Sequence, residues 1–510
     1  MASNIPPLPG LTLQQIAQGL DHGDFTVKEL TEAHLARIKA LDPSLHALLQ
    51  LNPAAISIAT ALDEEMMCSG RRGPLHGVPT LIKDNIVTNE ALEATAGSLA
   101  LLGCKPIRES PAVTKLRAAG AVILGTSNCS EWANFRSRPS DSGWSARGGQ
   151  TYGAYHDNQD PGGSSSGSAV GVDVGMCVLA LGTETSGSII IPAARNNIVG
   201  IKTTTGLVSR ASVIPVSQEQ DTVGPMARTV TDAATMLGVI AGKDGGDTKT
   251  NLIPFEFIPD YRGACEHTDI SSLRVGIPRN SVDKAASDEI LESFWGVVDL
   301  LRTRVAEVIE FEFPGQATFD DLSPEKTLDA MAGDFNIAIA DYLGKLTNNP
   351  DNLQAIEDIC ELVKSTEGEE YPERNIARLE QAASRVADSA EYMAGQEVRT
   401  YLAGDGGIKG ALNKHSLDAI VVPSKAPANY FAACGGFPQI TIPLGYQTAD
   451  LGVKFNDTGN LVEDGPNIPY GISIIGDSFS EVSLLRIGTV LENITRTRDA
   501  AGARRLQRFR

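Results

Sequence analysis

The sequence predicts an α/β fold in which a central mixed β-sheet has helices on both faces. Short apolar runs typical of buried strands recur along the chain of 510 residues, and between them lie segments with apolar residues at helical spacing. Such alternation is the pattern of α/β proteins. The hydrophobic content of 42% is enough for a large core. We find no internal repeat and no clear boundary, so we expect a single domain over residues 1–510.

The first predicted elements are two helices. Thr12 is a suitable N-cap for the first, and the second is expected over Val27–Leu41, ending before Pro43. Pro111–Leu124 follows as an αβ unit in which Gly120 ends a helix and a strand begins. Four more short apolar runs predict strands at Arg274–Ile277, Ala419–Val422, Gln439–Ile442 and Gly471–Ile475.

The stretch Gly162–Pro192 is the most unusual part of the chain. Clusters of Gly, Ser and Thr at Gly162–Ser168 and Gly182–Ser188 bracket the apolar run Ala169–Leu181. Segments rich in Gly and Ser are commonly flexible linkers. A linker would not contain such apolar runs. We therefore predict tightly packed backbone that holds hydroxyl groups in fixed positions.

Composition excludes several classes of function. The net charge of −20 argues against electrostatic binding to nucleic acid or to anionic lipid. No apolar run is long enough to span a membrane, and Met1–Gly10 lacks the features of a secretory signal. The seven cysteines form no C-x-x-C pair, so neither a zinc site nor a disulfide framework is indicated. We expect a cytoplasmic protein without metal, nucleic-acid partner or membrane partner.

A serine hydroxyl needs a base before it can act as a nucleophile. Gly163–Gly167 matches G-x-S-x-G, the nucleophile elbow of α/β-hydrolases. In that interpretation Ser165 is the nucleophile, and His267 or His415 is the base. The pattern is short, however, and the chain contains 50 glycines. It is therefore weak support for a histidine-based site.

Lysine is the alternative base. Lys83 follows the apolar run Thr80–Ile82, which places its amine at the end of a buried strand. Beside Asp84, the simplest interpretation of this lysine alone is a surface ion pair. To accept a proton the amine must be neutral, and burial lowers a lysine pKa by several units from about 10.4. Lys83 alone does not decide between the two interpretations.

Three segments taken together resemble the amidase signature family. They are Gly77–Asn85 with Lys83, Gly162–Gly167 with Ser164, and Gly182–Ile189 with Ser188, and the two serines are 24 residues apart as in the family. The resemblance extends over nearly the whole chain. The string Trp-Ser-Ala-Arg-Gly-Gly-Gln points to the bacterial peptide amidases. Other matching segments are Gly125–Phe135, Gly143–Thr151, Gly206–Arg210 and Asp221–Arg228.

The resemblance implies an amidase-signature domain with a Ser–cis-Ser–Lys triad. Ser188 would attack the amide carbonyl and become acylated. Ser164, after a cis peptide bond, would relay a proton between Ser188 and the base Lys83. Water would then hydrolyse the acyl-enzyme, and no cofactor is implied. Backbone N–H groups of Thr185, Ser186, Gly187 and Ser188 would form the oxyanion hole.

The resemblance also implies how the domain is organised. The catalytic core is expected over about 73–230, a variable helical region on the substrate side over 291–412, and the C-terminal strands and helix over 417–498. We expect Ser145 and Arg147 to fix a loop. The predicted pocket is moderately apolar, from Met331, Phe335, Tyr342, Tyr430 and Phe431.

Several residues depart from the family pattern. Ser186 stands where peptide amidases have aspartate, Thr203 replaces a proline, and Asn197 replaces a glycine. Ile190 replaces an arginine that is widespread in the family, although peptide amidases also lack it. None of these changes removes a predicted catalytic group, so they bear on specificity.

The expected function is hydrolysis of a linear amide, such as a peptide C-terminal amide or an intermediate of secondary metabolism. The expected partners are a small-molecule amide and water, with the chain a monomer or a homodimer. One alternative is an amidotransferase component resembling the glutamyl-tRNA amidotransferase. The other is a catalytically silent amide-binding protein of the same fold.

Overall fold

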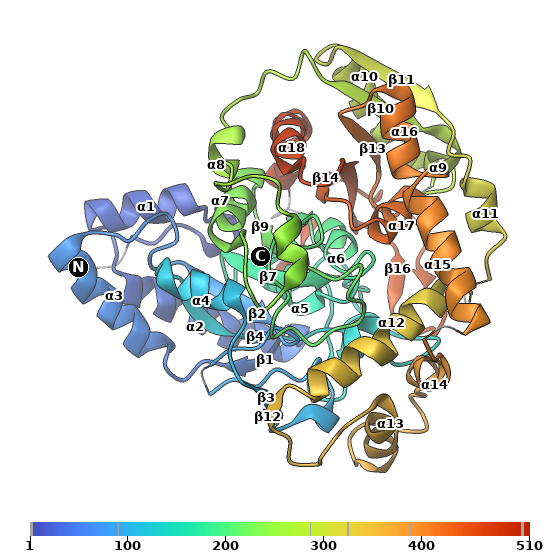
Figure 1. The fold of residues 1–510 in the computed structure, drawn as a ribbon. Helices are drawn as coiled ribbons and strands as arrows, with labels where there is room; N and C mark the ends of the chain where they lie inside the picture. The colour runs from blue at the N-terminus through green and yellow to red at the C-terminus, as the bar shows by residue number, and fades with distance from the viewer. Residues whose placement is uncertain are drawn as a thin grey trace.

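A mixed eleven-stranded β-sheet forms the centre of the computed structural model, which describes residues 4–89, 91–285, 287–323, 326–387, 389–500 and 504–509 (Figure 1). Strand β2 is parallel to β4 and β7, and β10 is parallel to β11 and β13. The other neighbouring pairs are antiparallel, which confirms the predicted mixed sheet. In sheet order the strands are β1 (Leu48–Leu51), β4 (Val122–Ser127), β2 (Pro79–Lys83), β7 (Leu179–Glu184), β9 (Thr222–Ala227), β8 (Val199–Lys202), β14 (Gln439–Tyr446), β17 (Pro469–Ile475), β13 (Ala419–Pro423), β10 (Arg274–Pro278) and β11 (Glu307–Phe311).

Helices flank this sheet. Those at the N-terminus, α1 to α3, lie on the opposite side of the molecule from α12 to α15 (Figure 1). None of the helices in the described part of the chain is long and apolar enough to cross a membrane. The helices are α1 (Leu13–His22), α2 (Val27–Leu45), α3 (Ala55–Ser69), α4 (Pro111–Ala118), α5 (Ser166–Asp173), α6 (Ile190–Arg195), α7 (Val230–Ile240), α8 (Tyr261–Ala264), α9 (Arg279–Val282), α10 (Asp288–Arg302), α11 (Gln316–Asp320), α12 (Lys326–Leu343), α13 (Ile356–Ser365), α14 (Ala377–Ser384), α15 (Ala390–Ala403), α16 (Ile408–His415), α17 (Pro427–Cys434) and α18 (Glu481–Thr495).

Three two-stranded sheets complete the structure, and they pair β3 with β12, β5 with β6, and β15 with β16. The sheet of β3 and β12 joins the predicted helical region to the segment before α4. The region 291–412 is therefore chiefly helical, as expected, but it also contains strands. The additional strands are β3 (Lys105–Pro106), β5 (Trp144–Ser145), β6 (Gly149–Gln150), β12 (Leu346–Asn348), β15 (Lys454–Phe455) and β16 (Val462–Asp464).

Of the two predicted N-terminal helices, the first begins as expected and the second ends later than expected. Thr12 caps α1 through a capping box with Gln15, as expected. The predicted end of α2 is wrong, because the helix continues through Pro43 to Leu45. Pro43 lies in the last turns, where a missing N–H removes only one helical hydrogen bond. The Asp42 carboxylate accepts hydrogen bonds from the N–H groups of Ala47 and Leu48, which stabilises the chain just beyond the helix.

The stretch Gly162–Pro192 is packed in the core, so the linker interpretation is wrong. It forms α5, strand β7 and the start of α6, and every residue from 162 to 190 except Ser186 is buried. A Cβ atom on Gly167 would lie 2.1 Å from the main-chain oxygen of Ala47. Only glycine permits this close approach of two backbone segments, which explains the unusual composition.

A second apolar cluster joins helices α12 to α14 to the loop that follows β4. Phe335 of α12 is fully buried, with its ring centroid 6.1 Å from that of Trp132 and 5.2 Å from that of Phe135. The apolar face of α13 joins the same cluster through Ile359 and Val363. These contacts place α12 to α14 over the loop that follows β4.

Replacing Gly224 with alanine is expected to destabilise the sheet. In β9, a Cβ atom on Gly224 would lie 1.9 Å from the main-chain oxygen of Ile201 in the neighbouring strand β8. Because the flanking strands cannot move apart without losing hydrogen bonds, we expect G224A to lower the free energy of unfolding by about 3 kcal/mol in denaturant titrations.

Gly238 provides the matched control in the adjacent helix α7. It is exposed, and a Cβ atom there would meet no atom within 4 Å. Alanine is favoured over glycine in a helix by about 1 kcal/mol, so G238A is expected to stabilise the protein. Equal effects of the two substitutions would contradict this packing account.

Candidate active site

Lys83, the last residue of β2, is fully buried and surrounded by oxygen atoms. Its amine donates hydrogen bonds to Ser164 Oγ at 2.7 Å, to Ser165 Oγ at 3.0 Å, and to Thr183 at Oγ1 (2.8 Å) and the main-chain oxygen (3.1 Å). Among the described residues, no carboxylate oxygen lies within 4 Å of this amine. Burial lowers the pKa of Lys83 to about 8, because desolvation penalises the charged form.

Asp84 does not pair with Lys83, so the surface ion-pair interpretation is wrong. Successive side chains of a strand point to opposite faces, and Asp84 accepts hydrogen bonds from Thr95 and from the N–H of Gly97. Its charged partner is Arg147, with an N–O distance of 3.2 Å. Ser145 Oγ donates to Asn128 Oδ1 at 2.7 Å. Arg147 and Ser145 thus fix loops around the site, as predicted.

The predicted serines lie on two segments that contact each other. The bond between Gly163 and Ser164 is cis. The N–H of Ser165 donates to the main-chain oxygen of Ser188 at 3.0 Å, which joins the turn before α5 to the turn before α6. Lys83 and Ser164 are in direct contact, whereas no hydrogen bond between Ser164 Oγ and Ser188 Oγ is present among those of the described residues. Ser188 lies on the wall of a cavity and is 6% exposed.

Glu184 organises the backbone around Ser188. This buried carboxylate accepts hydrogen bonds from the N–H groups of Gly187 at 2.7 Å, Ile189 at 2.7 Å and Ile190 at 3.0 Å. Gly187, one of the four predicted oxyanion-hole residues, therefore has its N–H group engaged. The N–H groups of Ser186 and Ser188 have no hydrogen-bond partner among the described residues. Glu184 was not identified from the sequence, although it lies between Thr183 and Thr185 in the motif.

Asp221 holds Thr185, another predicted oxyanion-hole residue, through a hydrogen bond of 2.5 Å from Thr185 Oγ1. The other carboxylate oxygen of Asp221 accepts from the N–H groups of Val216 and Ser217. Val216 forms part of the cavity wall. Asp221 thus connects the turn before Ser188 to the loop that closes one side of the cavity.

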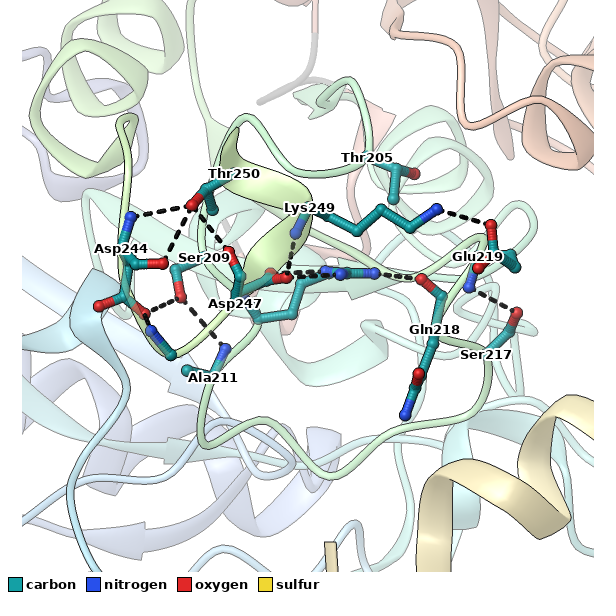
Figure 2. Close-up of polar contacts among 12 residues, drawn as sticks. Thr205, Ser209, Ala211, Ser217, Gln218, Glu219, Asp244, Asp247, Lys249 and Thr250 are labelled. Carbon is teal, nitrogen blue, oxygen red and sulfur yellow. Dashed lines mark hydrogen bonds and ion pairs between the residues drawn. The ribbon is translucent and has the colours of Figure 1, made fainter. Parts of the chain in front are cut away.

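That loop, residues 209–219, is anchored at its two ends (Figure 2). Arg210 forms an ion pair of 2.7 Å with Asp247, and Glu219 forms one of 2.6 Å with Lys249. Lys249 belongs to the short 3-10 helix Thr248–Leu252, and Asp247 is the N-cap of this helix. The anchors fix the loop that contains Val216.

A cavity of about 280 Å³ opens beside Ser188. Two of the predicted pocket residues, Met331 and Tyr430, line it. The other three are core residues: Phe335 and Phe431 are fully buried, and Tyr342 is 6% exposed. The sequence analysis did not assign six other lining residues to the pocket, although the first three lie in the matching segment Gly125–Phe135. They are Ala133, Asn134, Phe135, Val216, Phe319 and Arg378.

The histidine-based alternative lacks a base. Among the described residues, Ser165 Oγ forms hydrogen bonds only with Lys83 and Thr183, and no histidine lines the cavity. His267 is exposed, and the ring of His415 stacks on Phe311 outside the cavity. In the described part of the chain, no group of His, Cys, Asp and Glu side chains is arranged to hold a metal ion.

The departures from the family pattern have structural explanations at two positions. Asn197 has a φ angle of 55°, in the left-handed region that glycine favours and asparagine tolerates. Thr203 Oγ1 donates to the main-chain oxygen of Val223 at 3.2 Å. Ile190 is fully buried at the start of α6, and Ser186 lies on the cavity wall.

Comparison with known proteins identifies the family. The profile of the amidase family matches residues 29–485. The chain belongs to the amidase family. It is therefore an enzyme that hydrolyses amides, and it is 39% identical over 522 residues to a candidate amidase from Arthroderma benhamiae, covering 98% of this chain and 87% of the relative.

Two further proteins are similar to this chain over nearly its whole length. The native peptide amidase from Stenotrophomonas maltophilia has a TM-score of 0.86 and 34% identity, with 96% of this chain and 98% of that chain covered. The chain is also 32% identical over 509 residues to a glutamyl-tRNA(Gln) amidotransferase component from Chloroflexus aggregans, covering 95% of this chain and 96% of the relative. The expected resemblance to the amidase signature family is confirmed.

Glu184→Gln is expected to weaken the turn before α6. The amide has one acceptor oxygen in place of two and sets an NH₂ group against backbone N–H groups, so a buried donor loses its partner. We expect E184Q to lower the free energy of unfolding by about 2–3 kcal/mol, measured by thermal denaturation.

Glu219→Gln is the control, because Glu219 is half-exposed and its ion pair with Lys249 lies at the surface. Surface ion pairs contribute about 0–1 kcal/mol. An E184Q protein as stable as E219Q would show that the carboxylate does not hold this turn.

Proposed function

We propose that this amidase cleaves a linear amide through an acyl-enzyme on Ser188, with Ser164 and Lys83 as the proton relay. The observation that supports the proposal best is the buried amine of Lys83, which contacts Ser164 Oγ at 2.7 Å and has no carboxylate partner among the described residues. Its pKa of about 8 leaves a useful neutral fraction near neutral pH. A neutral amine accepts the Ser164 proton as Ser164 takes the proton of Ser188.

Attack of Ser188 Oγ on the amide carbonyl places negative charge on the carbonyl oxygen. The N–H groups of Ser186 and Ser188, which no described residue engages, are the donors we assign to this oxyanion, and Thr185 completes the turn. Preorganised donors of this kind contribute about 3–4 kcal/mol each to transition-state stabilisation. Because the Gly187 N–H donates to Glu184, we assign Gly187 a structural role in the turn.

Collapse of the tetrahedral intermediate breaks the carbon–nitrogen bond and requires a proton on the leaving amine. In the proposal, the Lys83 ammonium returns this proton through Ser164. Without this proton the departing nitrogen would leave as an amide anion, which is a poor leaving group. Water then attacks the ester on Ser188 by the same relay. This step releases the carboxylic acid and regenerates the free serine.

The similarity to the peptide amidase of Stenotrophomonas maltophilia favours a peptide C-terminal amide as the substrate. The cavity accommodates a compact acyl group, with apolar walls formed by Phe319, Met331 and Val216. We propose that these walls contact the side chain next to the cleaved amide.

The second candidate function is that of an amidotransferase component, favoured by the 32% identity to the relative from Chloroflexus aggregans. Such a component would transfer ammonia to an activated acyl group supplied by partner proteins. Amide hydrolysis by the purified chain, without partner proteins, ATP or tRNA, would favour the hydrolase. Hydrolysis that requires them would favour the amidotransferase.

Ser188→Ala is expected to abolish covalent labelling by a fluorophosphonate probe, detected by intact-mass spectrometry, because the probe reacts with an activated serine. Lys83→Met, which keeps the length but not the amine, is expected to lower amide hydrolysis about a thousandfold or more.

His267→Ala and His415→Ala are the controls, and both are expected to retain labelling and activity. Loss of activity in either folded histidine variant would contradict the proposal and support the histidine-based elbow. Labelling that persists in S188A would move the nucleophile to another serine.

A further inference from the structure

Arg378 near the start of α14 brings a cation to the cavity beside Ser188. Its Nη1 donates to the main-chain oxygen of Asn134, while its buried Nε has no hydrogen-bond partner among the described residues. Of the described residues that line the cavity, Arg378 alone is charged. No carboxylate of the described part of the chain lies within 4 Å of its guanidinium.

Two other arginines around the site have a carboxylate partner, whereas Arg378 has none among the described residues. Arg147 pairs with Asp84, and Arg399 pairs with Asp334 at 2.5 Å. For Arg378, burial lowers the pKa to about 10, and the nearby positive charge of Arg138 acts in the same direction. The Arg378 side chain is half-buried, and partial removal of a charge from water without an opposite charge is unfavourable. In a chain with a net charge of −20, an uncompensated cation in the cavity indicates that a ligand supplies the missing negative charge.

We propose that Arg378 binds a carboxylate on the acyl part of the amide substrate, so that the enzyme prefers an acyl group with one negative charge close to the cleaved amide. This inference rests on the proposed function of Ser188. The contact of Nη1 with Asn134 fixes the guanidinium plane, and the buried Nε is covered by protein atoms, so Nη2 is the group that we assign to the ligand. The N–H groups of Nη2 can donate charge-assisted hydrogen bonds to a carboxylate oxygen.

The rest of the cavity limits the size of the acyl group. Its volume of about 280 Å³ admits a short chain, and Val216, Phe319 and Met331 provide apolar contact for the methylene groups. Ser188 lies on the wall of the same cavity. A monoamide of a short dicarboxylic acid has the required features, namely an amide at one end, a few methylene groups and a carboxylate at the other end.

Glutaramate and its neutral isostere 5-oxohexanamide are the substrates that test the assignment. We expect the unmodified enzyme to have a kcat/KM for glutaramate about tenfold to a hundredfold above that for the isostere, as charge-assisted hydrogen bonds provide. Arg378→Gln is expected to remove most of this preference, mainly by raising the KM for glutaramate. Arg378→Lys keeps the charge without the planar guanidinium and is expected to retain part of the preference.

Arg385→Gln is the matched control, because Arg385 follows the same helix and pairs with Asp329 at 3.0 Å away from the cavity. It is expected to leave the preference unchanged. Equal hydrolysis of the two amides by the unmodified enzyme would overturn the inference. A preference for glutaramate that survives in R378Q would overturn it as well.

Binding separates this inference from the proposed function. In the Ser188→Ala background, glutarate is expected to raise the unfolding temperature, and Arg378→Gln is expected to abolish this shift. Absence of a glutarate shift, with Ser188 still labelled by fluorophosphonate, would overturn the role of Arg378 and leave the nucleophile in place. If the unmodified enzyme is not labelled at Ser188 but glutarate still raises the unfolding temperature, the proposed catalytic function would be wrong and the anion site would be supported.

Stability distinguishes a ligand-binding arginine from a structural one. Removing an uncompensated, half-buried charge relieves desolvation, so R378Q is expected to unfold at the same temperature as the unmodified protein or higher. A clear decrease in unfolding temperature for both R378Q and R378K would show a structural role and overturn the inference.

Discussion

The arrangement of the site depends on the burial of one amine. Lys83 has exchanged the water around its ammonium group for the hydroxyl groups of Ser164, Ser165 and Thr183. Hydroxyl groups stabilise the charged form less than water or a carboxylate would, so the pKa decreases. The packed Gly and Ser clusters are what bring these hydroxyl groups to the end of β2. The composition of the stretch Gly162–Pro192 is therefore a requirement of the site.

The surrounding charges keep this amine isolated. Asp84, its neighbour in sequence, faces away and is neutralised by Arg147, while Glu184 is committed to backbone N–H groups. Burial raises the pKa of Asp84 to about 6, which is still below neutral pH. A carboxylate in contact with Lys83 would raise the pKa of the amine and remove its capacity to accept a proton. Because Asp84 and Glu184 bind other groups, the neutral form of the Lys83 amine is preserved.

A buried ion cluster stabilises the loop that lines the cavity. Trp132, Ala133 and Asn134 all have positive φ angles, a conformation that asparagine tolerates but that is unfavourable for tryptophan and alanine. Just outside them, Arg136 pairs with Glu131 at 2.5 Å and also with Glu369 from the segment before α14. Burial and the charge of Glu369 raise the pKa of Glu131 well above its usual value. The cluster joins the unfavourable loop to the segment that leads to Arg378.

Much of the fold and part of the geometry of the candidate site could be predicted from the sequence. Strand positions, the mixed sheet and the direct contact between Lys83 and Ser164 follow from apolar runs and from motifs that are local in the chain. The end of α2 could not be predicted, since tertiary contacts override the effect of a proline. The cavity residues Asn134 and Arg378 could not be predicted either, because they meet only after α14 packs over the loop following β4.

The pH dependence of acylation tests the central role of Lys83 most directly. The base must be neutral, so kcat/KM for an amide, measured under single-turnover conditions, should rise about tenfold per pH unit below the Lys83 pKa and level off above it. We predict a midpoint near pH 8, where the buried amine loses its proton. A profile with its midpoint near 6.5, the value for an unperturbed histidine, or one that is flat from pH 6 to 9, would contradict the account.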